Sequence, residues 1–210
     1  MTVDESRSAL IVVDVQNDFC PGGALAVPEG DAVVRPINRL SPAFRHVVFT
    51  QDWHPTNHVS FAATWPGRAP YDTVDAGGIR QVLWPAHCVQ GSRGADFKEG
   101  LDVDRASLIL RKGARPRLDS YSALFENDRS TPTGLDGWLR SVGVGELWVC
   151  GLASDYCVFY TAMDALRLGY SVNLVEDAVR GVDVPAGSVA AALEEMRRSG
   201  VRFVNSSMEE

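Results

Sequence analysis

The chain has 210 residues, of which 45% are apolar and 22% are charged, a composition that excludes a disordered chain and supports one folded domain. Its 20 Lys and Arg stand against 27 Asp and Glu for a net charge of −7, and no segregated basic patch is present, so no nucleic-acid partner is expected. No apolar stretch reaches the roughly 18 residues of a membrane span, so no membrane partner is expected either.

The start of the chain carries Asp4 and Glu5 and leads into a short apolar run, unlike a signal peptide with its basic start and small-residue cleavage site, so a cytoplasmic protein is expected. Four cysteines, Cys20, Cys88, Cys150 and Cys157, could pair by number. A reducing cytoplasm would keep them as thiols, and a chain of this size does not need disulfides for stability. No Cys-x-x-Cys pair occurs, so a zinc ribbon is not expected.

Short apolar runs alternate with helix-like segments along the chain. The expected strands cover 9–14, 46–51, 107–111, 146–150, 171–175 and 201–204, and the expected helices cover 30–40, 135–142, 157–168 and 186–199. Most runs are continuously apolar, which is typical of strands buried on both faces of a parallel sheet. The pattern predicts a three-layer α/β/α fold with a mostly parallel, roughly six-stranded sheet.

Residues 52–104 interrupt this alternation. The segment is rich in Gly, Pro, Trp and His and has little periodicity. A loop of this length inside a compact domain is usually functional. We therefore predict a single domain over residues 1–210, in which an insertion at about 52–104 builds a metal site.

Polar side chains follow the apolar runs. Asp14 ends the first run, Asp52 follows the second, Lys112 follows the third, and Cys157 comes seven residues after the fourth. Ligands bind beyond the carboxyl ends of the strands in open α/β sheets. A carboxylate, an ammonium and a thiol are thus expected at one edge, which resembles the surroundings of an activated nucleophile.

Each of these residues also has a structural interpretation. The positive end of a helix macrodipole would lower the pKa of the Cys157 thiol, but a buried structural cysteine is an equal alternative. Lys112 would hold a neighbouring thiolate and carboxylate ionised, or would be an ordinary solvated lysine. Asp14 would be the carboxylate of this set, or a helix or turn cap.

Histidines and a carboxylate of the insertion have metal-ligand spacing. Asp52 and His54 lie on one face of an extended chain, His87 could supply a third ligand, and His58 is a candidate fourth. Such a set with open positions is typical of a catalytic site for Zn²⁺, Fe²⁺ or Mn²⁺. The alternative is loop histidines bonded to the backbone.

Aromatic residues accompany these polar positions. Phe19, Trp53, Trp65 and Trp84 could form walls for a flat ring substrate. For Trp53 and Trp65 we favour packing of the insertion instead.

Several segments of the chain resemble the nicotinamidase/pyrazinamidase group of the isochorismatase-like cysteine hydrolases. They are DVQNDFC at 14–20, QDWHP at 51–55, WPAHC at 84–88, KG at 112–113, DSYSA at 119–123 and GLASDYCV at 151–158. They occur in the order found in the family and span nearly the whole chain. The set Asp52, His54 and His87 distinguishes nicotinamidases within this superfamily.

The resemblance implies the isochorismatase-like hydrolase fold and a role for each matching residue. It implies Cys157 as nucleophile, Asp14 as proton shuttle and Lys112 as the charge that stabilises the thiolate. It implies one divalent ion on Asp52, His54 and His87, with Zn²⁺ favoured over Fe²⁺ or Mn²⁺, while His58 matches a ligand of only some members.

The substrate contacts are implied in the same way. Phe19 and Trp84 would enclose the pyridine ring, next to Leu152 and Ala153. A cis Leu152–Ala153 peptide would direct the N–H groups of Ala153 and Cys157 into an oxyanion hole.

The implied reaction is hydrolysis of nicotinamide to nicotinate and ammonia through a thioester, with pyrazinamide as a second substrate and a role in NAD salvage. A homo-oligomer is one option for the assembly. The first alternative is a related amidase that acts on another small carboxamide or a ureide. The second is a non-catalytic binding protein of the same fold. A metalloenzyme with Cys157 as a ligand is disfavoured, because Cys157 follows a different strand from Asp52 and His54.

Overall fold

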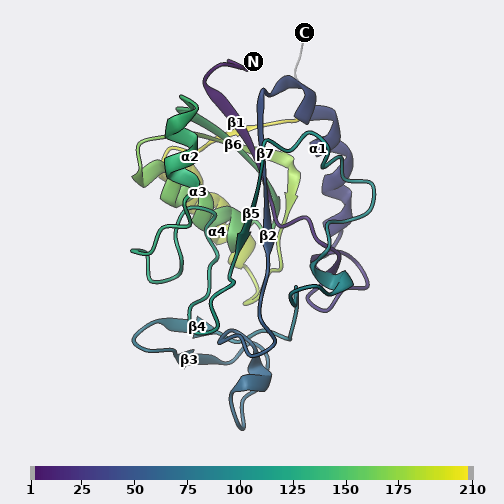
Figure 1. Ribbon diagram of the computed structural model, residues 1–210, viewed down its shortest axis with the longest axis vertical. Coiled ribbons are helices and arrows are strands. Elements are labelled where there is room, and N and C mark those ends of the chain that lie inside the picture. The colour runs from purple at the N-terminus through teal and green to yellow at the C-terminus, as the bar shows by residue number, and fades with distance from the viewer. Residues whose placement is uncertain (1–2, 208–210) are drawn as a thin grey trace.

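The computed structural model describes residues 3–207, so the ends of the expected domain at residues 1–2 and 208–210 lie outside the described part. A six-stranded sheet forms the middle layer, and all of its strand pairs are parallel (Figure 1). In order across the sheet, the strands are β5 (Leu108–Lys112), β2 (His46–Asp52), β1 (Ser8–Val13), β6 (Glu146–Leu152), β7 (Ser171–Arg180) and β8 (Arg202–Val204). The expected α/β/α fold is confirmed.

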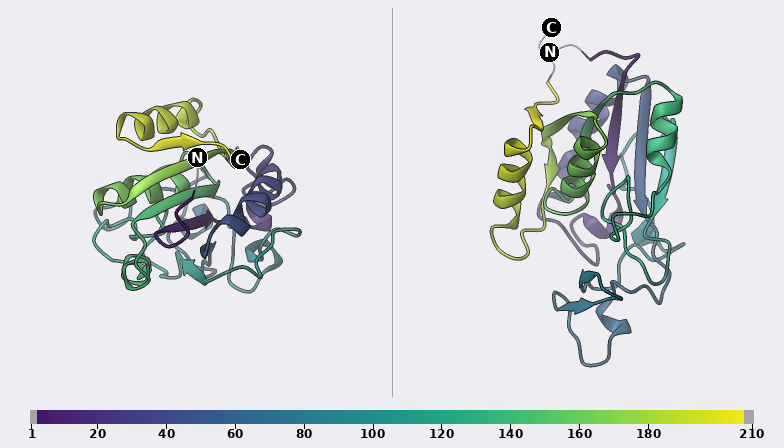
Figure 2. Two further views of the ribbon diagram at one scale, coloured as in Figure 1. Left: turned by 90° about the horizontal axis from the view of Figure 1, so that it is seen from above. Right: turned by 90° about the vertical axis from the view of Figure 1, so that its left-hand side faces the viewer.

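Helices cover both faces of the sheet (Figures 1 and 2). They are α1 (Val34–Leu40) on one face and α2 (Leu135–Ser141), α3 (Cys157–Arg167) and α4 (Ser188–Arg198) on the other. All six residues of β1 are buried, with Leu10 and Val12 in the core under α1 and Ile11 in the core on the opposite face. A strand buried on both faces has no polar side to alternate with, which explains its continuous apolar sequence.

The expected elements match the observed ones with local differences. The strand expected at 171–175 continues to Arg180 as β7, and the helix expected at 30–40 begins as a 3₁₀ turn at Gly30–Val33 before α1. The helix expected to begin at residue 186 begins at Ser188, because Gly187 before it has a φ of +87°. No helix of residues 3–207 combines the length and the apolar character needed to cross a membrane.

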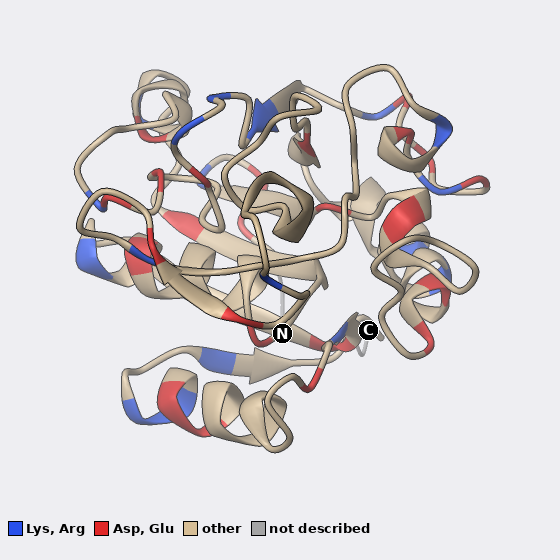
Figure 3. Ribbon diagram, turned by 90° about the horizontal axis from the view of Figure 1, so that it is seen from below, with Lys and Arg blue, Asp and Glu red and all other residues tan. Residues whose placement is uncertain are grey.

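The first part of the insertion, with β3 (Thr73–Asp75) and β4 (Arg80–Val82), lies beyond the carboxyl end of the sheet, at the bottom of Figure 1. The last part of the insertion runs back beside α1, where Asn38 donates to the Gly100 carbonyl oxygen. The strands β3 and β4 form an antiparallel hairpin, which the sequence did not predict. Each strand has only three residues, of which only the central one is fully buried: Val74 in β3 and Gln81 in β4. Such strands are too short for alternating apolar and polar residues to be recognised in the sequence. Viewed from below, acidic and basic residues are interspersed along the ribbon (Figure 3).

Strand register brings the polar residues together. Asp52, the last residue of β2, pairs with Lys112 at the end of β5, and Val13 of β1 pairs with Gly151 of β6. Asp14 follows immediately with a φ of 47°, so the chain leaves the sheet there. The carboxyl ends of β1, β2, β5 and β6 thus meet at one edge.

Gly151 provides a test of this close packing. A Cβ at this position would lie 2.1 Å from the Val13 carbonyl oxygen, and the residue has a φ of +104°. We expect Gly151→Ala to lower the free energy of unfolding by about 2–4 kcal/mol in a urea titration. The matched control is Gly137→Ala in α2, where nothing lies within 4 Å of the added Cβ. That variant should be neutral or up to about 1 kcal/mol more stable, and equal stability of the two variants would contradict the packing described.

Candidate active site

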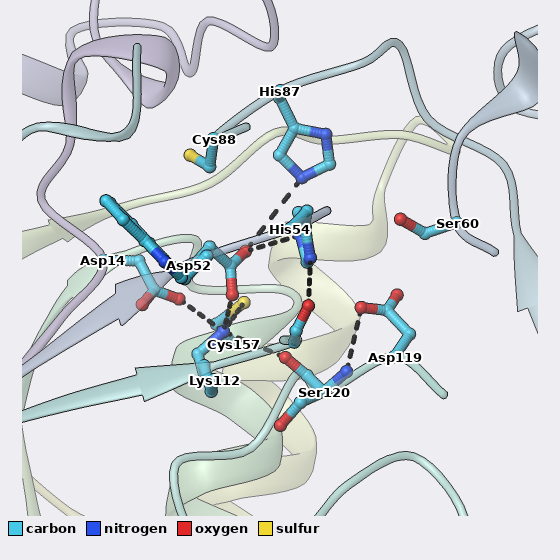
Figure 4. A network of polar contacts seen from close by, with 12 residues as sticks. Asp14, Asp52, His54, Ser60, His87, Cys88, Lys112, Asp119, Ser120 and Cys157 are labelled. Carbon is cyan, nitrogen blue, oxygen red and sulfur yellow. Dashed lines mark hydrogen bonds and ion pairs between the residues drawn. The ribbon is translucent and has the colours of Figure 1, made fainter. Parts of the chain in front are cut away.

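The ammonium group of Lys112 occupies the centre of the site (Figure 4). The side chain is fully buried, and its Nζ lies 2.8 Å from Asp14 Oδ2 and in direct contact with Asp52 Oδ1. It also donates to the Ser120 carbonyl oxygen at 2.9 Å and lies 3.5 Å from Cys157 Sγ. The lysine is therefore fully desolvated, more so than expected for a strand end, and two carboxylates compensate its charge.

The charges of this cluster shift one another's titration. Burial alone would lower the pKa of Lys112, but Asp14 and Asp52 raise it well above its ordinary value. Burial likewise opposes ionisation of Asp52, yet Lys112 and His54 hold the pKa of Asp52 below its usual range. Burial raises the pKa of Asp14 to about 6, with the Lys112 ammonium acting in the opposite direction. Asp14 is thus a carboxylate at neutral pH that can still accept a proton.

Cys157 begins α3, as expected, but the expected lowering of its thiol pKa is wrong. Burial raises the pKa of Cys157 well above its ordinary value, Lys112 opposes the rise, and Asp14 and Asp52 reinforce it. Burial, reinforced by the two carboxylates, outweighs the helix N-terminus, whose effect is a fraction of one charge. The resting thiol is therefore protonated, and the Asp14 carboxylate, which lies within 4.8 Å of Cys157 Sγ, is the group that can remove the proton.

The remaining cysteines do not belong to this cluster of charges. Cys20, Cys88 and Cys150 are buried free thiols, as expected of structural cysteines. Burial raises the pKa of Cys20 to about 11 and that of Cys88 well above its ordinary value.

The three expected metal ligands lie together. His54 Nδ1 is 2.8 Å from the Gly113 carbonyl oxygen, and His87 Nδ1 is 2.8 Å from the Pro85 carbonyl oxygen. Both contacts place the ring proton on Nδ1, so each Nε2 faces Asp52 Oδ2, at 3.5 Å and 4.0 Å. Histidines oriented by backbone carbonyls in this way are typical of metal ligands. The donor set fits a divalent metal ion.

The protonation states of the two histidines are consistent with a metal site. Burial lowers the pKa of His87 to about 4, so its imidazole is neutral at physiological pH. Burial acts in the same direction on His54, but Asp52 raises the pKa of that ring. A proton on His54 therefore competes with a cation for the same carboxylate, and metal binding would weaken in acid.

His58 lies in a neighbouring group. Its ring stacks on that of His54 with centroids 4.1 Å apart, and its Nδ1 contacts Ser60 Oγ at 2.7 Å. Among residues 3–207, its Nε2 has no hydrogen-bond partner. The structure groups His58 with His54 and Asp119 rather than with Asp52 and His87.

A small cavity opens onto these groups. Its walls comprise Phe19, Leu25, Asp52, His54, Trp84, His87, Asp119, Tyr121, Ala153, Tyr156, Cys157 and Val182. Phe19, Trp84 and Ala153 thus line it as expected. The Leu152–Ala153 peptide is cis, also as expected, but the Leu152 side chain is fully buried and does not reach the cavity. Leu152 therefore belongs to the core and not to the expected substrate contacts.

Other cavity residues escaped the sequence analysis. Asp119 accepts hydrogen bonds from Gln81 Nε2 and the Ser120 N–H, both at 2.8 Å, and Trp84 Nε1 donates to the Tyr121 hydroxyl at 3.2 Å. Asp119 and Tyr121 belong to segment 119–123, which is one of those that resemble the nicotinamidase group, and this resemblance was the only sequence signal for their role. Val182 had none.

Trp53 and Trp65 do not line the cavity, in line with the packing role favoured above. The guanidinium of Arg111 lies 3.7 Å from the centroid of the Trp53 ring. Trp65 Nε1 donates to the Val59 carbonyl oxygen at 2.8 Å.

Comparisons with known proteins agree on one family. The isochorismatase domain family matches residues 8–207. The nicotinamidase of Acinetobacter baylyi is 47% identical over 201 residues, which cover 96% of this chain and 94% of that protein.

Solved structures are similar along the whole chain. The Acinetobacter baumanii nicotinamidase/pyrazinamidase has a TM-score of 0.95 at 46% identity and covers 98% of this chain and 99% of its own. The L. infantum protein solved in complex with nicotinate has a TM-score of 0.86 at 42% identity, covering 99% and 96%. The pyrazinamidase of Pyrococcus horikoshii solved in complex with zinc has a TM-score of 0.76 at 39% identity, covering 95% and 99%.

Gly113 provides a test of the candidate metal site. A Cβ at this position would lie 2.4 Å from His54 Cε1 and 2.6 Å from Nδ1, so the imidazole would have to move. We expect Gly113→Ala to weaken zinc binding roughly 10-fold or more in a chelator competition. The control is Gly78→Ala, which has the same kind of positive φ, +88°, but nothing within 4 Å. Equal zinc affinity in both variants would contradict the role of His54.

Proposed function

The chain belongs to the isochorismatase family, and from this membership we propose that it is a nicotinamidase, an amidohydrolase that converts nicotinamide to nicotinate and ammonia. The observation that carries the proposal is the shared cavity, in which a thiol paired with a buried carboxylate faces a His/Asp ligand set between aromatic walls. The similarity to nicotinamidases over nearly the full length supports the same activity.

Acylation begins with proton transfer from Cys157 to Asp14. The thiolate attacks the carboxamide carbon, a C–S bond forms, and the carbonyl electron pair moves onto oxygen. Cys157 is the first residue of α3, so its N–H has no partner within the helix and, with the Ala153 N–H, can hold the oxyanion. Collapse of this intermediate breaks the C–N bond, Asp14 protonates the leaving nitrogen, and ammonia and a thioester result.

Deacylation uses the same groups in reverse. Asp14 removes a proton from water, the hydroxide attacks the thioester carbon, and the C–S bond breaks with the thiolate as leaving group. Lys112 stabilises the thiolate in both half-reactions, because its ammonium lies 3.5 Å from Cys157 Sγ. The proton on Asp14 returns to Cys157, and the carboxylic acid product loses its proton to solvent and leaves as nicotinate.

Asp52, His54 and His87 would hold one divalent metal ion, Zn²⁺ in preference to Fe²⁺ or Mn²⁺. When bound, the ion supplies a Lewis-acidic charge that binds the ring nitrogen of the substrate, directly or through water. The zinc complex of the Pyrococcus horikoshii pyrazinamidase supports the choice of metal. His58 would orient His54 through ring stacking, with direct ligation as the remaining option.

Phe19 and Trp84 would enclose the pyridine ring, and pyrazinamide, with a ring of the same shape, would be a second substrate. Four free buried thiols support a reducing, cytoplasmic location. The two cores on the faces of a single sheet support one domain over the chain. A role in NAD salvage follows from the reaction. We propose a homo-oligomer as one option for the assembly.

Removal of the thiol is the direct test of the reaction. We expect Cys157→Ala to abolish ammonia release from nicotinamide while zinc content stays at the level of the parent protein. The control is Cys150→Ala, which removes a buried thiol of β6 outside the cavity and should keep the activity of its folded fraction. Turnover by Cys157→Ala at the parent rate would exclude the thioester mechanism. A folded, zinc-loaded parent without activity on nicotinamide would instead indicate another amide or ureide substrate.

The pKa of Asp14 determines the acid limb of the pH profile. Only the carboxylate can accept the thiol proton, and burial raises the pKa of Asp14 to about 6. Activity is therefore present above this pH and lost as the pH falls through it. We expect kcat/KM to fall about tenfold per pH unit below about pH 6, with circular dichroism confirming that the protein stays folded. A profile that stays flat to about pH 4.5 would contradict the assignment of Asp14 as the base.

A further inference from the structure

Asp52 lies where its strand loses a neighbour. The pairing of β1 with β2 ends at Val12 and Phe49, whereas the pairing of β2 with β5 continues to Asp52. On the β5 side, the Trp53 N–H donates to the Lys112 carbonyl oxygen at 2.9 Å. The N–H and carbonyl of Asp52 point to the opposite side, which β1 has already left.

The side chain of Gln16 takes the place of the missing strand. Its Oε1 accepts the Asp52 N–H at 2.8 Å, and its Nε2 donates to the Asp52 carbonyl oxygen at 2.9 Å. The second Nε2 proton goes to the Ala95 carbonyl oxygen, also at 2.9 Å. The residue is 0% exposed, so no water competes for these bonds. The oxygen and the nitrogen of the side-chain amide both have partners, and the identity of these partners fixes which atom is Oε1 and which is Nε2.

The two hydrogen bonds from Gln16 to the Asp52 backbone form a clamp. The carboxylate of the clamped residue, Asp52, has two competing sets of partners. Oδ1 of Asp52 contacts the Lys112 ammonium, while Oδ2 faces the Nε2 atoms of His54 and His87. In a buried site the attraction to a full ammonium charge is strong. If the Asp52 backbone could shift, both carboxylate oxygens could turn toward Lys112 and leave the histidines. A backbone held on both its N–H and its carbonyl resists this movement.

We propose that Gln16 is a positioning residue that holds Asp52 in the orientation required for metal binding. This inference rests on the proposed metal site at Asp52, His54 and His87. Gln16 belongs neither to the cavity lining nor to the candidate ligand set, and it acts through the Asp52 backbone. Gln51, one residue before Asp52, also donates to the Ala95 carbonyl at 2.8 Å, so that carbonyl keeps a partner when Gln16 is replaced.

The test measures zinc affinity rather than turnover. Gln16→Met keeps the length of the side chain but leaves the Asp52 N–H and carbonyl unpaired. We expect its zinc dissociation constant, measured by chelator competition on metal-free protein, to rise about 10- to 100-fold, as is typical when a group that orients a metal ligand is lost. We also expect faster hydrogen exchange at the Asp52 amide. The matched control is Gln90→Met, an exposed glutamine that donates to the neighbouring Trp53 carbonyl, and its affinity should equal that of the parent.

A second variant keeps the test decisive. Gln16→Glu retains an acceptor for the Asp52 N–H but places an oxygen against the Asp52 carbonyl, so it should weaken zinc binding even if Gln16→Met does not fold. Folded variants that bind zinc as tightly as the parent, with only a lower melting temperature, would overturn the positioning role and leave the proposed function intact. A parent protein that binds no zinc would overturn the proposed metal site and this inference with it.

Discussion

The site depends on one buried ammonium group. Asp14 and Asp52 are both desolvated, and two carboxylates this close would repel each other without a cation between them. Lys112 supplies that cation and contacts both. The ammonium group thus compensates the charge of both carboxylates, which have separate roles. Asp14 serves the thiol, with a pKa raised by burial to a useful value, while Asp52 stays ionised for a metal ion. The two carboxylates differ in role because their remaining neighbours differ.

The fold explains why these groups meet. The strand order places β2 and β5 on one side of β1, and β6, β7 and β8 on the other. The direction in which the chain winds reverses between β1 and β6, and such a reversal opens a crevice at the carboxyl ends of the strands. Asp14 follows β1 and Cys157 follows β6, so nucleophile and base flank the crevice. The insertion then covers it and contributes His54, His87 and Trp84. Because β1 leaves the sheet first, the end of β2 needs the Gln16 side chain in place of a strand partner.

Much of this was predictable from the sequence because it depends on strand ends. Continuous apolar runs located the strands, and Asp14, Lys112 and Cys157 followed as the residues beyond them. The spacing of Asp52 and His54 indicated a shared face. Effects that depend on distance in space were not predictable. The raised pKa of the Cys157 thiol results from its burial and from the nearby carboxylates of Asp14 and Asp52, which are far away in the sequence. The burial of Leu152, the place of His58 beside Asp119 and the clamp by Gln16 depend on side-chain directions that no linear pattern encodes.

The division of roles between the two carboxylates can be measured directly. Carbon-13 NMR of labelled aspartate carboxyl groups in the metal-free protein, assigned with Asp14→Asn and Asp52→Asn, would follow each group through a pH titration. If Lys112 organises the site as described, Asp14 titrates near pH 6 and Asp52 stays ionised throughout the range in which the protein is folded. Titration of both groups near the ordinary value of about 3.9 would contradict a shared, desolvated ammonium as the basis of the site.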